Sequence, residues 1–81
     1  IPASVVTSAG AVDIAVHGWD VARARGRVQP IPEQLAGDLL EISPLLVSRA
    51  DRPARFAAPV AVPRQASASD RLVAYLGRDP A

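Results

Sequence analysis

The sequence has no cysteine, lysine or methionine, and only three of its 81 residues are aromatic. The absence of cysteine excludes the disulfide framework of small secreted domains and removes thiolates from the possible nucleophiles and metal ligands. With so few aromatic residues, a core has to be built from alanine, valine, leucine and isoleucine. Since 49% of the residues are hydrophobic, the composition is still that of a folded chain rather than a disordered one.

The charges nearly cancel, with nine arginines against eight acidic residues, and the signs alternate along the chain. Nucleic-acid binding is disfavoured because it would need a basic patch and exposed stacking aromatic rings. No apolar run approaches the roughly 20 residues needed to cross a membrane. No signal peptide is recognisable, because the first turn lacks basic residues and Asp13 interrupts the apolar run. We therefore expect a soluble protein of the cytoplasm.

A chain of 81 residues corresponds to one small domain or to part of a larger one. At this size only about 60–65% of the unfolded surface becomes buried, so an isolated core is marginal. The chain also enters a predicted helix almost at once, after Ile1-Pro2. From both observations we expect residues 1–81 to be one portion of a helical assembly whose other helices come from elsewhere.

Hydrophobic spacing predicts a mainly α fold with three helices. The first should run over residues 3–25, with Pro2 in its first turn and Gly26 as its stop. Its apolar stripe consists of Val5, Val6, Ala9, Val12, Val16 and the neighbourhood of Trp19. Gly10 and Gly18 each cost up to about 1 kcal/mol relative to alanine in a helix interior. Two such glycines point to another helix packed close by, or to space beside a ligand.

A second helix is predicted over residues 32–49, beginning with Pro32 in its first turn and Glu33 near the positive end of the helix dipole. Its buried face is formed by Leu35, Leu39, Ile42 and Leu46, which repeat at helical spacing. Pro44 removes one helical hydrogen bond, so the helix should kink or restart there. We expect the chain to leave the helix through Asp51-Arg52-Pro53.

The remaining residues predict an extended, proline-rich segment and a short last helix. In residues 56–62, alternate side chains should lie on one side of the segment: Phe56, Ala58, Val60 and Val62. Pro59 and Pro63 keep this segment at the edge of a sheet or outside any sheet. The last helix should run over residues 69–76, after an N-cap in the Ser67-Ala68-Ser69-Asp70 stretch. It should bury Leu72, Val73 and Leu76 and end at Gly77.

Asp13 and His17 are the candidate metal ligands. Four residues apart on a helix, they lie on one face about one turn apart, and carboxylate oxygen and neutral imidazole both bind zinc. Two ligands do not complete a site, and the sequence offers no second histidine and no cysteine. The alternative is a hydrogen-bonded Asp13–His17 pair that satisfies two polar groups on a buried helix face.

Other polar and aromatic side chains have two readings each. Asp20 could accept a hydrogen bond from the second ring nitrogen of His17, or form an ordinary ion pair with Arg23 three residues later. Trp19 could line a pocket or belong to a core or an interface. The arginines are candidate anchors for a substrate carboxylate, or simply a solvated face. Nucleophilic catalysis has little support, because no serine lies in a G-x-S-x-G turn.

The stretch from Val12 to Ala24, Val-Asp-Ile-Ala-Val-His-Gly-Trp-Asp-Val-Ala-Arg-Ala, resembles a family signature. It is similar to the acid-x3-His-Gly-Trp-Asp-(Leu/Val)-Ala motif of a DinB-like family related to mycothiol-dependent maleylpyruvate isomerase. The tail resembles the same family: Arg55-Phe56, then Pro59-Val60-Ala61-Val62-Pro63, then Asp70-Arg71-Leu72 and Leu76-Gly77-Arg78-Asp79-Pro80. Two separated matches in the same order cover most of the chain.

The resemblance implies a divalent-metal site in a four-helix bundle. In that family an acidic residue and a histidine one turn later bind the metal, which corresponds to Asp13 and His17 here. A further histidine from an early helix completes the triad, and it has no counterpart in residues 1–81. The resemblance therefore implies that this chain is the C-terminal portion of a DinB-like bundle. The implied metal is zinc, and the implied activity is a thiol-dependent isomerase or S-transferase that uses mycothiol.

A non-catalytic helical module is the alternative reading. In it, the long helix is an interface, and two copies of the chain form a homodimer that rebuilds a four-helix bundle across a two-fold axis. The two readings differ in metal content. A protein without bound metal whose stability does not change in chelator would favour the interaction module.

Overall fold

The computed structural model describes residues 3–46 and 56–81, and within these ranges the fold is mainly helical and has no strand. Three helices follow one another: α1 (Ala3–Ala24), α2 (Glu33–Leu46) and α3 (Ala68–Tyr75). The predicted helix starts and stops agree with these bounds to within one residue wherever the prediction falls on described residues. The predicted end of the second helix at 49 and the predicted exit at 51–53 lie outside the described residues.

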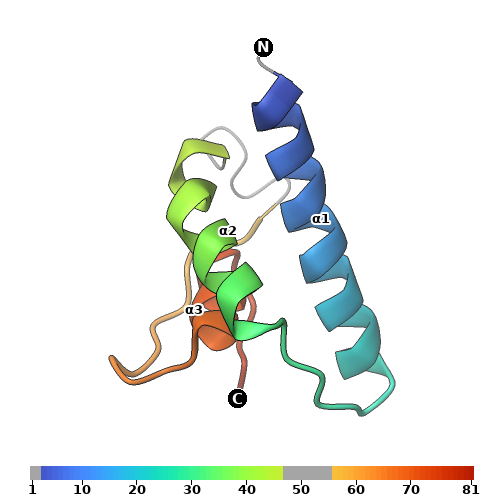
Figure 1. The fold of residues 1–81 in the computed structure, drawn as a ribbon. Helices are drawn as coiled ribbons and strands as arrows, with labels where there is room; N and C mark the ends of the chain where they lie inside the picture. The colour runs from blue at the N-terminus through green and yellow to red at the C-terminus, as the bar shows by residue number, and fades with distance from the viewer. Residues whose placement is uncertain (1–2, 47–55) are drawn as a thin grey trace.

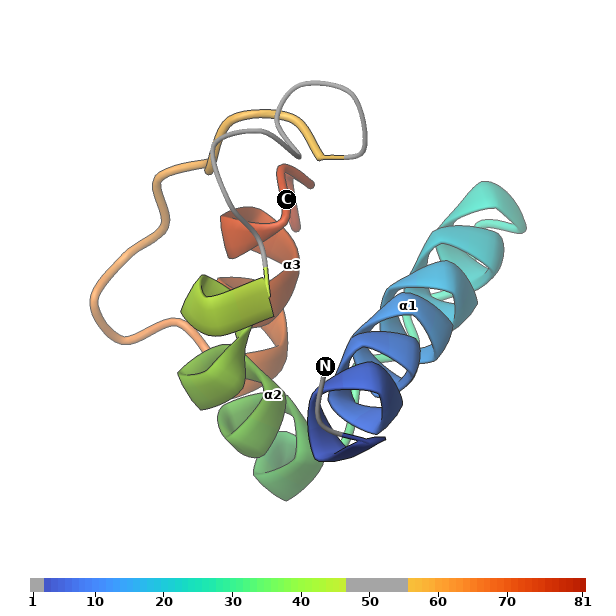
Figure 2. The same cartoon turned by 90° about the horizontal axis from the view of Figure 1, so that it is seen from above.

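The helices α2 and α3 form a pair on one side of the molecule, and the longer helix α1 stands on the other side (Figures 1 and 2). Between them α2 is the common neighbour, since it packs against both α3 and α1. None of the helices among the described residues is long and apolar enough to span a membrane.

A glycine ends α1, as predicted. Gly26 has φ = +72°, a left-handed conformation that residues with a Cβ rarely adopt. Its N–H donates to the carbonyl of Arg23 at 3.0 Å, and the N–H of Arg27 donates to the carbonyl of Ala22 at 2.9 Å. These two bonds form a Schellman motif, which satisfies the last carbonyls of the helix and turns the chain toward α2.

The short helix α3 is fixed at both ends by similar local signals. Ser67 is its N-cap, as predicted, and its hydroxyl accepts a hydrogen bond from the N–H of Asp70 at 3.1 Å. At the other end Gly77 has φ = +92° and donates to the carbonyl of Ala74 at 3.0 Å. The N–H of Arg78 then donates to the carbonyl of Val73 at 2.8 Å, which completes a second Schellman motif. Arg78 therefore leaves the helix in a fixed direction.

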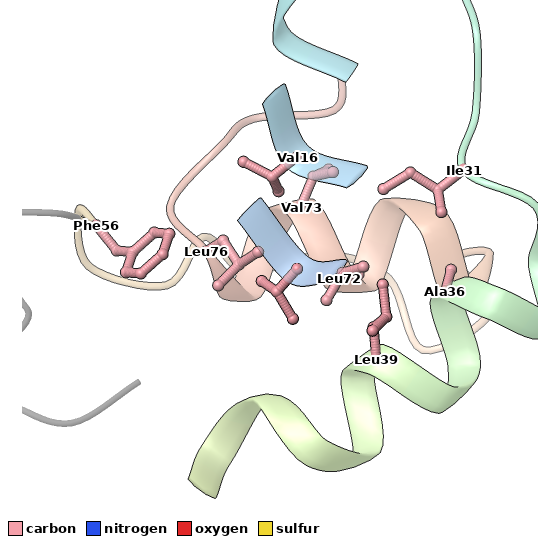
Figure 3. Close-up of a cluster of buried hydrophobic side chains, with 9 residues drawn as sticks. Val16, Ile31, Ala36, Leu39, Phe56, Leu72, Val73 and Leu76 are labelled. Atoms are coloured by element: carbon pink, nitrogen blue, oxygen red, sulfur yellow. The ribbon is translucent and has the colours of Figure 1, made fainter. Parts of the chain in front are cut away.

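A single hydrophobic cluster joins the three helices (Figure 3). In Figure 3, Val16 lies opposite Val73, and Leu76 lies beside Phe56. The predictions for α3 are confirmed, because Leu72, Val73 and Leu76 are fully buried. In α1, Val12 and Val16 are buried as predicted, and Trp19 is partly buried against the cluster. The predicted burial of Val5, Val6 and Ala9 falls outside what the structure describes.

The buried face of α2 differs from the prediction. Leu35 was expected to be buried, but it is 44% exposed. Leu39 is buried as predicted, together with Ala36 and Ser43, which were not predicted. Of the other predicted positions, Ile42 and Leu46 are half-buried. The physical reason is size: Ala36 and Ser43 are small, so their side of the helix can approach its neighbours closely, while the bulkier Leu35, Ile42 and Leu46 lie at its margin. The helix also continues through Pro44 to Leu46 instead of restarting.

The extended segment 56–63 lies along α3 and belongs to no strand within the described chain. The N–H of Val60 donates to the carbonyl of Ala74 at 2.8 Å, which holds the segment to the helix. Phe56 is buried, and Val60 and Val62 are half-buried. Ala58, expected on the same side, is exposed, so the predicted alternation holds only in part.

Candidate functional site

An open groove of about 750 Å³ runs along α1. Its lining consists of Asp13, Ile14, Val16, His17, Gly18, Asp20, Phe56 and Arg78. Six of these residues come from α1, and the other two come from the start of the extended segment and from the residue after Gly77. The groove is therefore a helix face with one wall supplied by the C-terminal part of the chain.

Asp13 and His17 both line this groove, and both side chains are exposed. They lie four residues apart within α1, so the helix holds them on one face about one turn apart. The alternative reading placed them on a buried face, and in this structure that face of the helix is open to solvent. The groove therefore has a carboxylate and an imidazole in its lining.

The chemistry of these two donors suits a divalent cation such as zinc. Within residues 3–46 and 56–81, no group of three histidine, cysteine, aspartate or glutamate side chains is placed to hold a metal ion. A zinc site needs three or four ligands, so Asp13 and His17 by themselves would not complete one.

The partner of Asp20 is neither His17 nor Arg23, the two residues expected from the sequence. Its carboxylate accepts two hydrogen bonds from Arg78, from Nε at 3.2 Å to Oδ1 and from Nη2 at 2.9 Å to Oδ2. The two expected partners, His17 and Arg23, are replaced by a residue 58 positions further along the chain. This two-point contact uses the planar fork of the guanidinium, the geometry in which arginine binds carboxylates most specifically.

Arg78 is itself held by three groups. Besides Asp20, its Nη1 donates to the carbonyl of Leu76 at 2.8 Å, and its Cζ lies 5.8 Å from the centroid of the Phe56 ring. The side chains of Arg78 and Asp20 are 26% and 38% exposed. The ion pair is therefore partly shielded from water. It joins Arg78, in the wall of the groove, to Asp20 on α1.

Trp19 and Arg23 lie at the C-terminal end of α1, beside this wall. The Cζ of Arg23 is 5.0 Å from the centroid of the Trp19 ring, and its Nη1 donates to the carbonyl of Pro80 at 3.0 Å. Its Nη2 also contacts the carbonyl of Ala81. Arg23 thus holds the last residues against α1, and Trp19 lines a smaller hollow of about 250 Å³ with Ile31 and Leu35.

The two glycines of α1 lie in open space. Apart from the adjacent residues and the nearby backbone of α1 itself, no described atom comes within 4 Å of a Cβ built at Gly10 or Gly18. Between them Ile14 is 77% exposed, although it is one of the larger apolar side chains of the helix. The helix face that carries the candidate ligands is therefore uncovered by the part of the chain that the structure describes. The predicted close approach of another helix at these glycines does not occur within that part. Of the two glycines, Gly18 lines the groove and Gly10 does not.

Sequence reasoning missed Phe56 and Arg78 as groove residues. A local signal existed only for Arg78, since it follows Gly77 at a predicted helix stop and must leave the helix in a defined direction. Where that direction leads depends on how α3 packs against α1, which no local pattern encodes.

No protein-family model, curated protein or solved structure matches the chain.

Proposed function

We propose that this chain is the C-terminal part of a DinB-like, metal-binding helical bundle and that Asp13 and His17 are two ligands of a divalent metal, zinc. The observation that carries the proposal is that these two exposed side chains, one turn apart on α1, line the same groove of about 750 Å³. The remaining ligand comes from another segment of the protein or from a second chain. The motif from Val12 to Ala24 supports the same assignment by its resemblance to the family signature.

The activity that we propose for the intact protein is a thiol-dependent isomerase or S-transferase reaction with a mycothiol-type thiol. A bound zinc ion would lower the pKa of a thiol that binds to it, which favours the nucleophilic thiolate. The chain's own residues supply the binding surface. Ile14, Val16 and Phe56 give the groove an apolar lining beside the two ligands, which suits the carbon skeleton of an electrophilic substrate.

Metal titration of single variants tests the site. In isothermal titration calorimetry with Zn²⁺, we expect Asp13→Ala and His17→Ala each to weaken binding by more than about tenfold, because each removes one donor from a site with few donors. Asp38→Ala is the matched control, since it removes the same charge from the exposed side of α2. It should bind Zn²⁺ as the wild type does. Full affinity in both site variants would falsify the assignment of Asp13 and His17.

The proposal includes a partner that covers the open face of α1. A further helical segment or a second copy of the chain would bring the missing ligand and complete a four-helix bundle. A homodimer is the simpler form, because one surface then serves both partners. In this role we expect the protein to act in the cytoplasm.

A non-catalytic dimerisation module is the second candidate, and the exposure of Ile14 between two bare glycines favours it. Such a face suits close helix–helix packing and needs no metal. Chelation separates the two functions: the metal-binding protein should lose thermal stability when its zinc is removed with EDTA, because bound metal stabilises the folded state. The interaction module should melt at the same temperature with and without EDTA.

A further inference from the structure

A second groove, of about 370 Å³, lies between α2, the extended segment and α3, and we call it the α2–α3 groove. Among its described lining residues none belongs to α1, and none lines the groove that contains Asp13 and His17. The proposed function gives it no role. The α2–α3 groove therefore offers a binding place apart from the proposed metal site.

Most of the lining of the α2–α3 groove is apolar. Its six aliphatic or proline residues are Leu40 and Pro44 from α2, Pro59, Val60 and Val62 from the extended segment, and Ala74 from α3. The N–H of Val60 donates to the carbonyl of Ala74 at 2.8 Å, which fixes the extended segment on α3. Leu40 packs against the hydrophobic cluster of the core. The apolar walls are thus held in place before any ligand binds, which lowers the cost of binding.

Arg71 is the one charged residue among the described residues of this lining. Its side chain is exposed, and within the described chain it has no hydrogen-bond or ion-pair partner, in contrast to Arg23 and Arg78. A guanidinium presents its N–H donors in a planar fork that fits the two oxygens of a carboxylate. One positive charge balances one negative charge, whereas a phosphate monoester carries about 1.5 to 2 negative charges at neutral pH. The groove therefore suits a monocarboxylate.

We infer that the α2–α3 groove binds a small monocarboxylic acid with a hydrocarbon body. The carboxylate of this ligand contacts the Arg71 guanidinium, and its hydrocarbon part lies against Leu40, Val60 and Val62. A second carboxylate on the ligand would be desolvated against the apolar lining without a partner, so dicarboxylic acids are disfavoured. Because the groove is open and Arg71 is exposed, binding is weak, and the dissociation constant of octanoate should be about 1 mM.

A nuclear magnetic resonance titration of the intact, isotope-labelled protein tests the inference. With EDTA present, octanoate should cause saturable shifts in the backbone amide signals of Val60, Val62 and Ala74. Hexanoate, shorter by two methylenes, should bind about tenfold more weakly, because each buried methylene contributes up to about fourfold in affinity. 1-Octanol has the same hydrocarbon body without the charge, and it should bind about fivefold more weakly than octanoate.

Variants of Arg71 test the role of its charge. Arg71→Gln should weaken octanoate binding about fivefold and leave the binding of 1-octanol unchanged. Arg71→Glu should reverse the preference, so that octylammonium binds more tightly than octanoate. Arg25→Gln is the matched control, because it removes the same charge from an exposed position just after α1. It should bind octanoate as the wild type does.

The inference is overturned if octanoate gives no saturable shifts, if the shifts lie outside the α2–α3 groove, or if Arg71→Gln keeps the wild-type affinity for octanoate. A preference of Arg71→Glu for octanoate overturns it as well, and this test remains if Arg71→Gln does not fold, as judged by its amide spectrum. Because EDTA removes any bound metal, these titrations do not depend on Asp13 and His17. Failure of this inference and failure of the proposed metal site are therefore separate results.

Discussion

Two glycines with the same local role differ in their surroundings. Gly26 and Gly77 both end a helix with positive φ, at +72° and +92°. A Cβ at Gly26 meets no atom within 4 Å, whereas a Cβ at Gly77 would lie 2.8 Å from both Cβ and the carbonyl oxygen of Ala57. Gly26 is therefore required only by its dihedral angle, and Gly77 also by the segment that crosses it.

Alanine substitutions should separate these two requirements. We expect Gly26→Ala to destabilise the fold by about 1 kcal/mol, the cost of a left-handed conformation. Gly77→Ala should cost about 2–4 kcal/mol, because Ala57 must move as well. Gly37→Ala, in the open interior of α2, should stabilise by about 0.5–1 kcal/mol. Urea denaturation of the three variants measures these differences, and equal losses at Gly26 and Gly77 would contradict the crowding at Ala57.

At the scale of elements, polar contacts join the start of α2 to the start of α3. The buried hydroxyl of Ser69 accepts a hydrogen bond from the N–H of Ile31 at 2.9 Å. The carboxylate of Glu33 accepts one from the N–H of Ala68 at 2.8 Å. The connection after α1 is thereby fixed to α3, which sets the direction in which α2 begins.

The two buried serines should respond differently to alanine. Ser69→Ala leaves the N–H of Ile31 buried without its acceptor, so we expect a loss of about 1–3 kcal/mol. Ser43 is equally buried, but its hydroxyl only donates to the Leu39 carbonyl one turn earlier, which the helix already uses. Ser43→Ala should therefore change stability by less than about 0.5 kcal/mol. Urea denaturation of both variants measures the two changes in stability. A greater loss of stability for Ser43→Ala than for Ser69→Ala would contradict this prediction.

The elements themselves were predictable because their signals are local. Gly26, Ser67 and Gly77 mark helix ends by conformations and caps that depend on a few neighbouring residues. Which face of α2 is buried was not predictable in the same way. Hydrophobic spacing favoured Leu35, but close packing favoured the small Ala36, and only the neighbouring helices decide between them. The contact of Asp20 with Arg78 was likewise invisible, since it joins residues 58 positions apart.

At the scale of the whole molecule, the uncovered face of α1 predicts association. Ile14 is 77% exposed beside the candidate ligands, and its burial by a second copy would favour a dimer. We expect light scattering after gel filtration to give a dimer mass for the wild type and a monomer mass for Ile14→Asp. Val28→Asp is the control, because Val28 is 93% exposed in the connection after α1 and should leave the mass unchanged. A wild-type monomer would contradict dimerisation through this face.

The distance of 58 residues between Asp20 and Arg78 also orders events during synthesis. At about 5–20 residues per second, a ribosome adds Arg78 roughly 3–12 s after Asp20. During this interval Asp20 lacks the partner that it has in the folded chain. The two-point ion pair therefore forms late, and the groove gains its C-terminal wall only after α3 has been made.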